Sequence, residues 1–171
     1  DVPPVDLSPK ADDADAWATK LDGQTILAGS IRLAGLSDVT ALDGFEAGAW
    51  WVQDAAARLP AKLLGDVQGQ TVLDLCAAPG GKTLELAAAG AVVTALDISA
   101  KRLNRVRDNL TRTGLSAELV AGDARKWRPE ALADAILLDA PCSSTGTLRR
   151  HPDIQHLKSA ADITKLAQVQ D

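Results

Sequence analysis

From Gly69 onward the sequence alternates short apolar runs with helical stretches, and this alternation limits the possible folds more than any other feature. The apolar runs are typical of strands buried on both faces, and they occupy residues 71–75, 91–96, 117–120 and 133–138. One helix is expected over residues 83–89, and a longer one begins after Ser99 as its cap and ends at Gly114. The pattern predicts a doubly wound α/β fold, which is a mostly parallel sheet with helices on both faces.

Residues 1–45 are rich in Asp, Ala and Gly and show little periodicity. Two short runs in this part, 25–27 and 30–33, are predicted to form strands between glycine turns. From residue 45 to residue 64 the pattern becomes helical, with side chains recurring at three- and four-residue steps at Trp51, Ala55, Arg58 and Leu59. Gly65 then offers a stop. We therefore expect an incomplete subdomain or connector over residues 1–45 and an α/β domain over residues 46–171.

The length and the amino-acid composition limit the classes of protein to which the chain can belong. With 171 residues, of which 46% are hydrophobic and 24% charged, the chain can bury the core of one compact domain. No apolar run approaches the roughly 20 residues that a membrane-spanning helix needs, and the acidic, proline-containing first residues lack the features of a signal peptide. The two cysteines, Cys76 and Cys142, form neither a Cys-x-x-Cys pair nor a Cys/His zinc spacing. We expect a cytoplasmic protein with no membrane segment, no disulfide framework and no bound metal.

The formal net charge of −5 argues against a chain that holds nucleic acid by its overall charge, because phosphate binding is largely electrostatic. The first sixty residues are acidic on balance, whereas the part after residue 100 is rich in arginine and lysine. A local basic patch is therefore still open, with the candidates Arg102, Arg105, Arg107, Arg112, Arg125, Lys126, Arg128, Arg149 and Arg150. For each of these residues the alternative is an ordinary solvated helix face.

Small residues connect the first predicted strand of the sheet to its helix, in the sequence Cys76-Ala77-Ala78-Pro79-Gly80-Gly81-Lys82-Thr83. Backbone N–H groups at the start of the helix can therefore approach a ligand closely, which points to a cofactor site. A P-loop would need a glycine at position 76, where this chain has cysteine. Gly80 and Gly81 are adjacent and do not fit the Gly-x-Gly-x-x-Gly dinucleotide fingerprint. An NTPase is disfavoured, and NAD binding is a second choice.

Acidic residues follow two of the predicted strands, at the sheet edge where this architecture binds ligands. Asp97, after strand 91–96, can accept hydrogen bonds from ribose hydroxyls, or it can compete with Ser99 to cap the next helix. Asp123, after strand 117–120, can accept a hydrogen bond from the amino group of an adenine, or it can be a turn aspartate. The residues alone leave both alternatives open.

Two motifs taken together resemble the Sun (Fmu) family of bacterial small-subunit (16S) ribosomal RNA cytosine-5 methyltransferases: residues 73–83, and Asp139-Ala140-Pro141-Cys142-Ser143-Ser144-Thr145-Gly146. The likeness runs from about Gly44-Phe45-Glu46, through Val52-Gln53-Asp54, to roughly His156. It implies a Rossmann-like S-adenosylmethionine-dependent methyltransferase fold, here incomplete at the C-terminus. Residues 1–45 would then be the remnant of an N-terminal RNA-binding subdomain, and residues 46–171 part of the catalytic domain. S-adenosylmethionine would be the cofactor and small-subunit ribosomal RNA the partner.

The resemblance also implies roles for individual residues. The contacts with S-adenosylmethionine would come from Cys76, Ala77, Ala78, Pro79, Gly80, Gly81 and Lys82 in the loop, from Asp97 and Arg102 near the ribose, from Asp123 at the adenine, and from Asp139. Asp139 would stand between the methyl donor and the target base, contacting the cytosine ring and its amino group. The residues that follow the second motif are candidates for contacts with RNA phosphates: Arg149, Arg150, His151 and Lys158.

Carbon 5 of cytosine is a poor nucleophile, so cytosine-5 methyltransferases first add a thiolate to carbon 6. The residues alone favour Cys142 as this nucleophile, because it follows Asp139 in a Pro-Cys turn. The resemblance instead assigns the attack to a later Thr-Cys-Ser segment, which these 171 residues lack, and associates the Pro-Cys residue with product release. We expect a truncated chain that holds the cofactor-binding half of the enzyme. The alternatives are a non-catalytic S-adenosylmethionine- or RNA-binding fragment and an NAD-dependent oxidoreductase.

Overall fold

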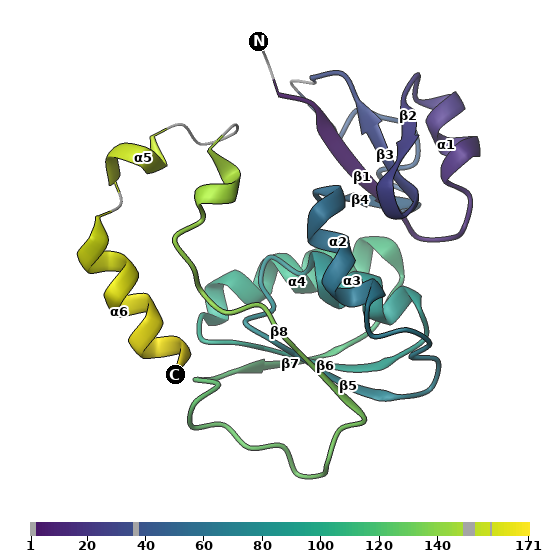
Figure 1. Ribbon diagram of the computed structural model, residues 1–171. Helices are drawn as coiled ribbons and strands as arrows, with labels where there is room; N and C mark the ends of the chain where they lie inside the picture. The colour runs from purple at the N-terminus through teal and green to yellow at the C-terminus, as the bar shows by residue number, and fades with distance from the viewer. Residues whose placement is uncertain (1–2, 36–37, 149–152, 158) are drawn as a thin grey trace. The chain divides into compact units, whose positions relative to one another are not determined.

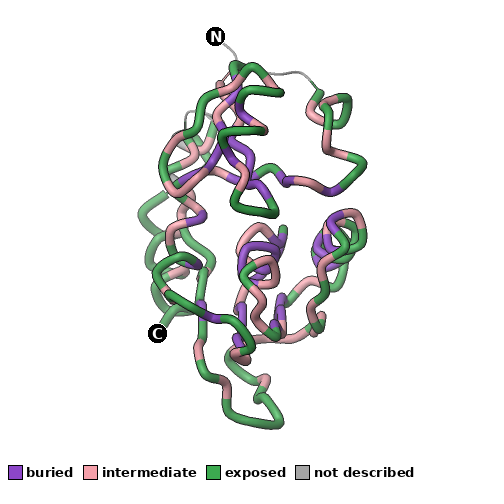
Figure 2. The backbone as a smooth tube through the Cα atoms, turned by 90° about the vertical axis from the view of Figure 1, so that its right-hand side faces the viewer, coloured by how far each residue is buried: buried purple, intermediate pink, exposed green. Residues whose placement is uncertain are grey.

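The computed structural model describes residues 3–35, 38–148, 153–157 and 159–171 (Figure 1). The chain forms two compact units, residues 1–138 and residues 139–171. The first unit holds two four-stranded sheets, one antiparallel and one parallel. The buried positions in Figure 2 belong to this first unit, and none of the described residues after Leu138 is buried. The hydrophobic cores of the described chain are therefore confined to residues 1–138.

The antiparallel sheet has the strand order β2-β3-β1-β4. Its part of the chain comprises β1 (Val5–Pro9), α1 (Ala14–Lys20), β2 (Gln24–Ile26), the 3-10 turn η1 (Leu27–Gly29), β3 (Ser30–Leu33) and β4 (Trp50–Val52). Leu7, Ile31 and Trp50 are fully buried and form its core together with Ala14 and Ala18 of α1. The predicted strands at 25–27 and 30–33 are confirmed as β2 and β3, except that Leu27 belongs to the turn.

The predicted helix over residues 45–64 is wrong in its first half, because Trp50–Val52 forms strand β4. This strand pairs with β1, and its two tryptophans are both buried in different cores, as expected for neighbours that point to opposite faces of a strand. The helix α2 covers only Ala55–Lys62, and it begins where the Asp54 carboxylate accepts a hydrogen bond from the Ala56 N–H at 2.9 Å. Trp51 fits a helical spacing, but its segment forms a strand because it pairs with the distant strand β1.

The parallel sheet has the order β7-β6-β5-β8, formed by β5 (Thr71–Leu75), β6 (Val92–Asp97), β7 (Glu118–Ala121) and β8 (Ala135–Leu138). The chain moves from β5 outward to β7 and then returns to the other side of β5, so the strand order reverses between β5 and β8. This is the order of a Rossmann-like sheet, and ligands bind at the carboxyl ends of the strands beside such a reversal. The predicted α/β class with a parallel sheet flanked by helices is confirmed.

The helices α3 (Gly81–Ala88) and α4 (Ala100–Thr113) lie on one face of the parallel sheet (Figure 1). Leu86 of α3 packs with residues of three strands, and Val106 of α4 is fully buried in a second cluster. The Ser99 hydroxyl accepts a hydrogen bond from the Arg102 N–H at 3.3 Å, and Gly114 ends the helix with a φ of 63°. Both predicted ends of this helix are confirmed.

The second unit contains the 3-10 turn η2 (Thr145–Thr147), the short helix α5 (Ile154–Leu157) and α6 (Ala160–Gln170). A capping box between Ser159 and Asp162 begins α6. At the other end of α6, the Gln170 side-chain amide donates a hydrogen bond to the Pro141 carbonyl oxygen at 2.7 Å.

The division into domains 1–45 and 46–171 stays a prediction.

Candidate cofactor and catalytic site

The loop that joins β5 to α3, residues 76–80, is held by backbone hydrogen bonds and close packing. The Ala77 N–H donates to the Leu96 carbonyl oxygen at 3.0 Å, and the Gly80 N–H donates to the Ala77 carbonyl oxygen at 2.8 Å. Gly80 has a φ of 107°, and a Cβ atom there would lie 3.0 Å from a methyl carbon of Val106. Both the backbone angle and the packing therefore require glycine at the entry to α3.

Gln53 connects this loop to the antiparallel sheet. A Cβ atom on Gly81 would lie 3.1 Å from Cδ of Gln53, so the amide group packs directly on the first residue of α3. The Gln53 Oε1 atom accepts hydrogen bonds from the Ser8 hydroxyl at 3.0 Å and from the Trp51 indole N–H at 2.7 Å. Gln53 is a buried positioning residue whose importance has no signal in the sequence beyond its place in the motif Val52-Gln53-Asp54.

Asp97 ends β6 and is only 2% exposed. Its Oδ2 atom accepts a hydrogen bond from the Ala78 N–H at 3.1 Å, and its Oδ1 atom accepts one from the Ser99 N–H at 2.9 Å. The Arg102 guanidinium lies 3.5 Å from the same carboxylate and donates to the Ala78 carbonyl oxygen at 2.6 Å. The structure thus brings the predicted residues Ala78, Asp97 and Arg102 together at the carboxyl ends of β5 and β6.

Asp74 and Thr83 form a second buried contact behind the loop. Both side chains are fully buried, and the Thr83 hydroxyl donates a hydrogen bond to Oδ2 of Asp74. The contact ties the interior of β5 to the first turn of α3, so it supports the loop from the core side. The signal for it in the sequence is a carboxylate in the middle of an apolar strand, Leu73-Asp74-Leu75, which is costly to bury without a partner.

Asp123 follows β7, next to the end of β6, where the Gly122 N–H donates to the Asp97 carbonyl oxygen at 3.0 Å. The Asp123 carboxylate accepts hydrogen bonds from the Arg125 N–H at 3.0 Å and from the Arg125 guanidinium at 2.7 and 3.0 Å. These hydrogen bonds from Arg125 lower the pKa of Asp123 to about 2. The predicted turn aspartate is therefore present, and a contact between Asp123 and an adenine stays a prediction.

The two predicted catalytic residues, Asp139 and Cys142, belong to the second unit and are both exposed. Asp139 follows β8 directly in the chain. The Cys142 sulfur accepts a hydrogen bond from the Ser144 N–H at 3.4 Å. Their catalytic roles stay predictions. The predicted RNA contacts Arg149, Arg150, His151 and Lys158 lie outside the described residues.

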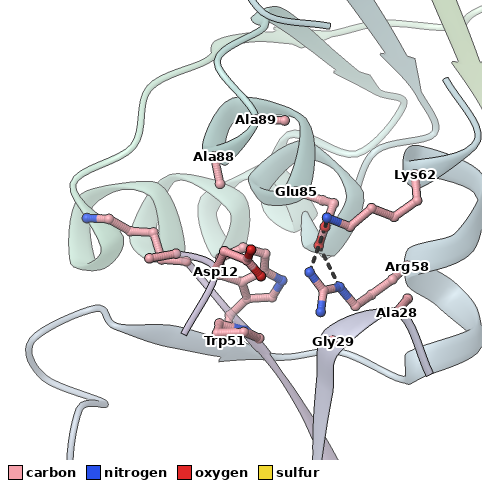
Figure 3. Close-up of a pocket in the computed structure, with 12 residues that line it drawn as sticks. Asp12, Ala28, Gly29, Trp51, Arg58, Lys62, Glu85, Ala88 and Ala89 are labelled. Atoms are coloured by element: carbon pink, nitrogen blue, oxygen red, sulfur yellow. Dashed lines mark hydrogen bonds and ion pairs between the residues drawn. The ribbon is translucent and has the colours of Figure 1, made fainter. Parts of the chain in front are cut away.

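A cavity of about 370 Å³ lies between the antiparallel sheet and the helices α2 and α3 (Figure 3). Its wall carries a buried ion pair in which the Arg58 guanidinium donates to both carboxylate oxygens of Glu85, at 2.8 and 2.9 Å. Lys62 lies 3.1 Å from the same carboxylate. Its lining includes none of the predicted site residues, so this cavity is separate from the carboxyl-end site.

In the part of the chain that the structure describes, no cluster of three or more His, Cys, Asp or Glu side chains is arranged to hold a metal ion. Likewise, none of the described helices combines the length and the apolar character needed to cross a bilayer.

Comparison with protein families matches residues 61–171 to the model of the 16S rRNA methyltransferase RsmB/F. Among curated relatives, "Ribosomal RNA small subunit methyltransferase B" of Vibrio vulnificus is 53% identical over 148 residues, which cover 82% of this chain and 34% of the relative. The protein of the same name from Sodalis glossinidius is 47% identical over 169 residues, covering 91% of this chain and 39% of the relative. The chain thus spans a little over a third of the length of these relatives.

Solved structures agree with the fold. NSun6 from Pyrococcus horikoshii, crystallised with SFG, is 32% identical with a TM-score of 0.71, and the match covers 80% of this chain and 36% of that one. A methyltransferase homolog protein from Pyrococcus horikoshii is 26% identical with a TM-score of 0.76, covering 94% of this chain and 55% of that one. The match with the methyltransferase homolog covers 94% of this chain and therefore includes strands of both sheets.

Proposed function

Because this chain belongs to the RsmB/F family of 16S rRNA methyltransferases, we propose that it provides the S-adenosylmethionine-binding part of an enzyme that methylates carbon 5 of a cytosine in small-subunit ribosomal RNA. The observation that carries the proposal is the joint placement of the glycine loop, Asp97 and Arg102 where the strand order of the parallel sheet reverses. An enzyme with this substrate works in the cytoplasm, where ribosomal RNA is found.

The residues at the carboxyl ends of the strands fit the chemical groups of S-adenosylmethionine. Backbone N–H groups of Gly81 and Lys82, at the start of α3, suit the methionine carboxylate. The carboxylate of Asp97 suits the ribose hydroxyls, and the ionised carboxylate of Asp123 suits the adenine amino group. The loop residues Cys76 to Gly80 would form the wall beside the cofactor. When bound, the cofactor supplies a methyl group on a positively charged sulfur.

Arg102 acts in this proposal by positioning the loop. Its guanidinium donates to the Ala78 carbonyl oxygen and lies 3.5 Å from the Asp97 carboxylate, so it holds the two sides of the site at a fixed separation. Asp97 is in turn fixed by two backbone N–H groups. A carboxylate held in this way needs little reorganisation when a ribose binds, which is the physical basis of preorganisation.

For the catalytic step, we assign to Asp139 the contact with the cytosine ring and its amino group, and to Cys142 a role in releasing the methylated product. Cys76 and Cys142 are the two cysteines of this sequence, and the sequence contains no Thr-Cys-Ser segment. On this proposal the 171 residues bind S-adenosylmethionine but do not transfer its methyl group to RNA by themselves. Transfer by this chain would instead make Cys142 the attacking nucleophile.

Isothermal titration with S-adenosylmethionine, followed by a methyl-transfer assay on unmodified small-subunit RNA, tests the proposal. We expect saturable binding to the wild-type chain without transfer. Asp97→Asn should weaken binding roughly tenfold to a hundredfold, because hydrogen bonds to a charged group contribute about 1.5–3 kcal/mol. Asp66→Asn is the matched control, since the exposed Asp66 carboxylate also accepts a backbone hydrogen bond, from Gln68. Tighter binding of NAD than of S-adenosylmethionine, or no binding by a folded chain, would overturn the cofactor assignment.

A further inference from the structure

The positive charge of this acidic chain is concentrated in one stretch. Between Asp97 and Glu130, eight lysines and arginines stand against five acidic residues, whereas the whole chain has a net charge of −5. Within this stretch, Lys101 and Arg105 lie one helical turn apart on α4, and Lys126 and Arg128 lie in the loop after β7. All four side chains belong to exposed residues. We call these four residues the α4–β7 patch.

The topology places both halves of the α4–β7 patch at the same end of the parallel sheet. The first turns of α4 follow the carboxyl end of β6, and the loop follows the carboxyl end of β7, which is the neighbouring strand in the sheet. The hydrogen bond from the Gly122 N–H to the Asp97 carbonyl oxygen joins the two connections. The patch therefore borders the glycine loop and Asp97, which occupy the same sheet end.

Most other cations of this stretch are engaged with the protein itself. Arg102 binds Ala78 and Asp97, Arg125 binds Asp123, and Arg112 donates to the Phe45 and Trp50 carbonyl oxygens. By contrast, within the described part of the chain, the side chains of Lys101 and Arg105 take part in no hydrogen bond or ion pair, and Lys126 makes none either but contributes a coulombic attraction that lowers the pKa of Asp123. Arg128 uses one guanidinium nitrogen on backbone carbonyl oxygens of its own loop. The patch thus presents positive charge that is only partly compensated within the fold.

We propose that the α4–β7 patch binds the phosphate backbone of the substrate RNA beside the cofactor loop. The inference rests on the proposed function, because the substrate of a ribosomal RNA methyltransferase is a polyanion that must be held next to the methyl donor. Two of the cations lie on a helix and two in the loop after the neighbouring strand, and positive charge spread over two segments suits a chain of phosphates better than a single small anion. Such contacts fix the position of the RNA without reading its sequence.

The test measures the affinity for a fluorescein-labelled, single-stranded transcript of small-subunit ribosomal RNA by fluorescence anisotropy, at several salt concentrations. The patch variant is Lys101→Ala with Lys126→Ala. The control is Lys20→Ala with Lys165→Ala, which also removes two exposed lysines, although Lys20 is ion-paired with Asp43 at 3.4 Å. The patch variant should raise the Kd roughly tenfold or more at about 0.1 M salt and reduce the salt slope by about 1.4, the value for two phosphate contacts on a single strand. The control should change the Kd by less than about twofold.

Equal weakening by both variants would show that the general charge of the chain, and not this patch, holds RNA, and would overturn the proposal. Unchanged affinity of the patch variant, or no RNA binding by the wild-type chain, would also overturn it. Titration of the same preparations with S-adenosylmethionine separates the two proposals. RNA binding that depends on the patch in a chain that does not bind S-adenosylmethionine would keep the patch and refute the cofactor assignment.

Discussion

At the carboxyl end of β6, the sequence alone could not decide which of two neighbouring residues caps α4. Asp97 and Ser99 were both candidates for capping α4, and the structure assigns the cap to Ser99 while Asp97 holds the Ala78 N–H and the Ser99 N–H. Local signals such as the cap and the Gly114 helix end could be predicted, because they depend on residues within one turn of the helix. The contact between Asp97 and Ala78 could not be predicted, because it joins the end of β6 to the loop after β5.

A substitution of Gly80 tests how closely the loop after β5 is packed. Gly80→Ala should lower the free energy of unfolding by about 2–5 kcal/mol, because alanine is strained at a φ of 107° and its Cβ atom would contact Val106. Gly69→Ala is the control, since Gly69 has a φ of 71° but no atom near the position of a new Cβ. It should cost only about 1–2 kcal/mol. Urea denaturation measures both, and equal losses would contradict the close packing of Gly80.

Asp123 allows a prediction about pH. Its pKa in the folded chain is about 2, below the usual 3.8, because Arg125 donates hydrogen bonds to the carboxylate. A lowered pKa means that the contact stabilises the fold above about pH 3.8 and is lost as the pH falls towards 2. An NMR titration of the side-chain carboxyl carbon should give a midpoint near 2, and Arg125→Ala should move this midpoint up towards 3.8. An unchanged midpoint in the variant would refute the assigned cause.

At the scale of elements, the strands and helices of the parallel sheet could be predicted almost completely from apolar runs and glycine stops. The antiparallel sheet could be predicted less well, because the segment of β4 fits a helical pattern. Strand β4 has three residues and depends on pairing with β1, so its own sequence contains too little pattern to reveal it. The buried ion pair between Arg58 of α2 and Glu85 of α3 could not be predicted either. The two residues lie far apart in the sequence, and each fits a helical pattern without the other.

This ion pair leads to a prediction for the contact between α2 and α3. Glu85→Gln should lower the free energy of unfolding by about 3–5 kcal/mol, because it leaves the Arg58 charge buried without its partner. Lys62→Ala removes a half-exposed cation from the same carboxylate and should cost less than about 1 kcal/mol. Chemical denaturation of both variants checks the difference. A small effect of Glu85→Gln would mean that water reaches Arg58.

For the whole molecule, burial separates the chain into parts of unequal stability. Since none of the described residues after Leu138 is buried, residues 1–138 contain the cores on which folding depends. We expect a chain of residues 1–138 to fold with nearly the same thermal midpoint as the full 171 residues. Hydrogen exchange should be fast in α6 and slow in β5 and β6. A fragment 1–138 that fails to fold, or strong protection of α6, would contradict this picture.

The family could be predicted from two motifs, and the comparisons confirm it. The residues of the cofactor loop and Asp97 meet in the structure because strand ends of a parallel sheet converge at one edge. Asp139 and Cys142 follow the last strand, in a unit without a buried core of its own among its described residues.

The two neighbouring tryptophans of β4 have a mechanical consequence. Trp50 is buried in the core of the antiparallel sheet, and Trp51 is buried in the core shared by α3 and α4. Adjacent Cα atoms are about 3.8 Å apart, so there is no slack between these two anchors. The two sheets of the first unit cannot swing on a hinge at β4 without pulling an indole ring out of one core. On the proposed function, the cofactor and the RNA would therefore meet two sheets that move as one rigid body.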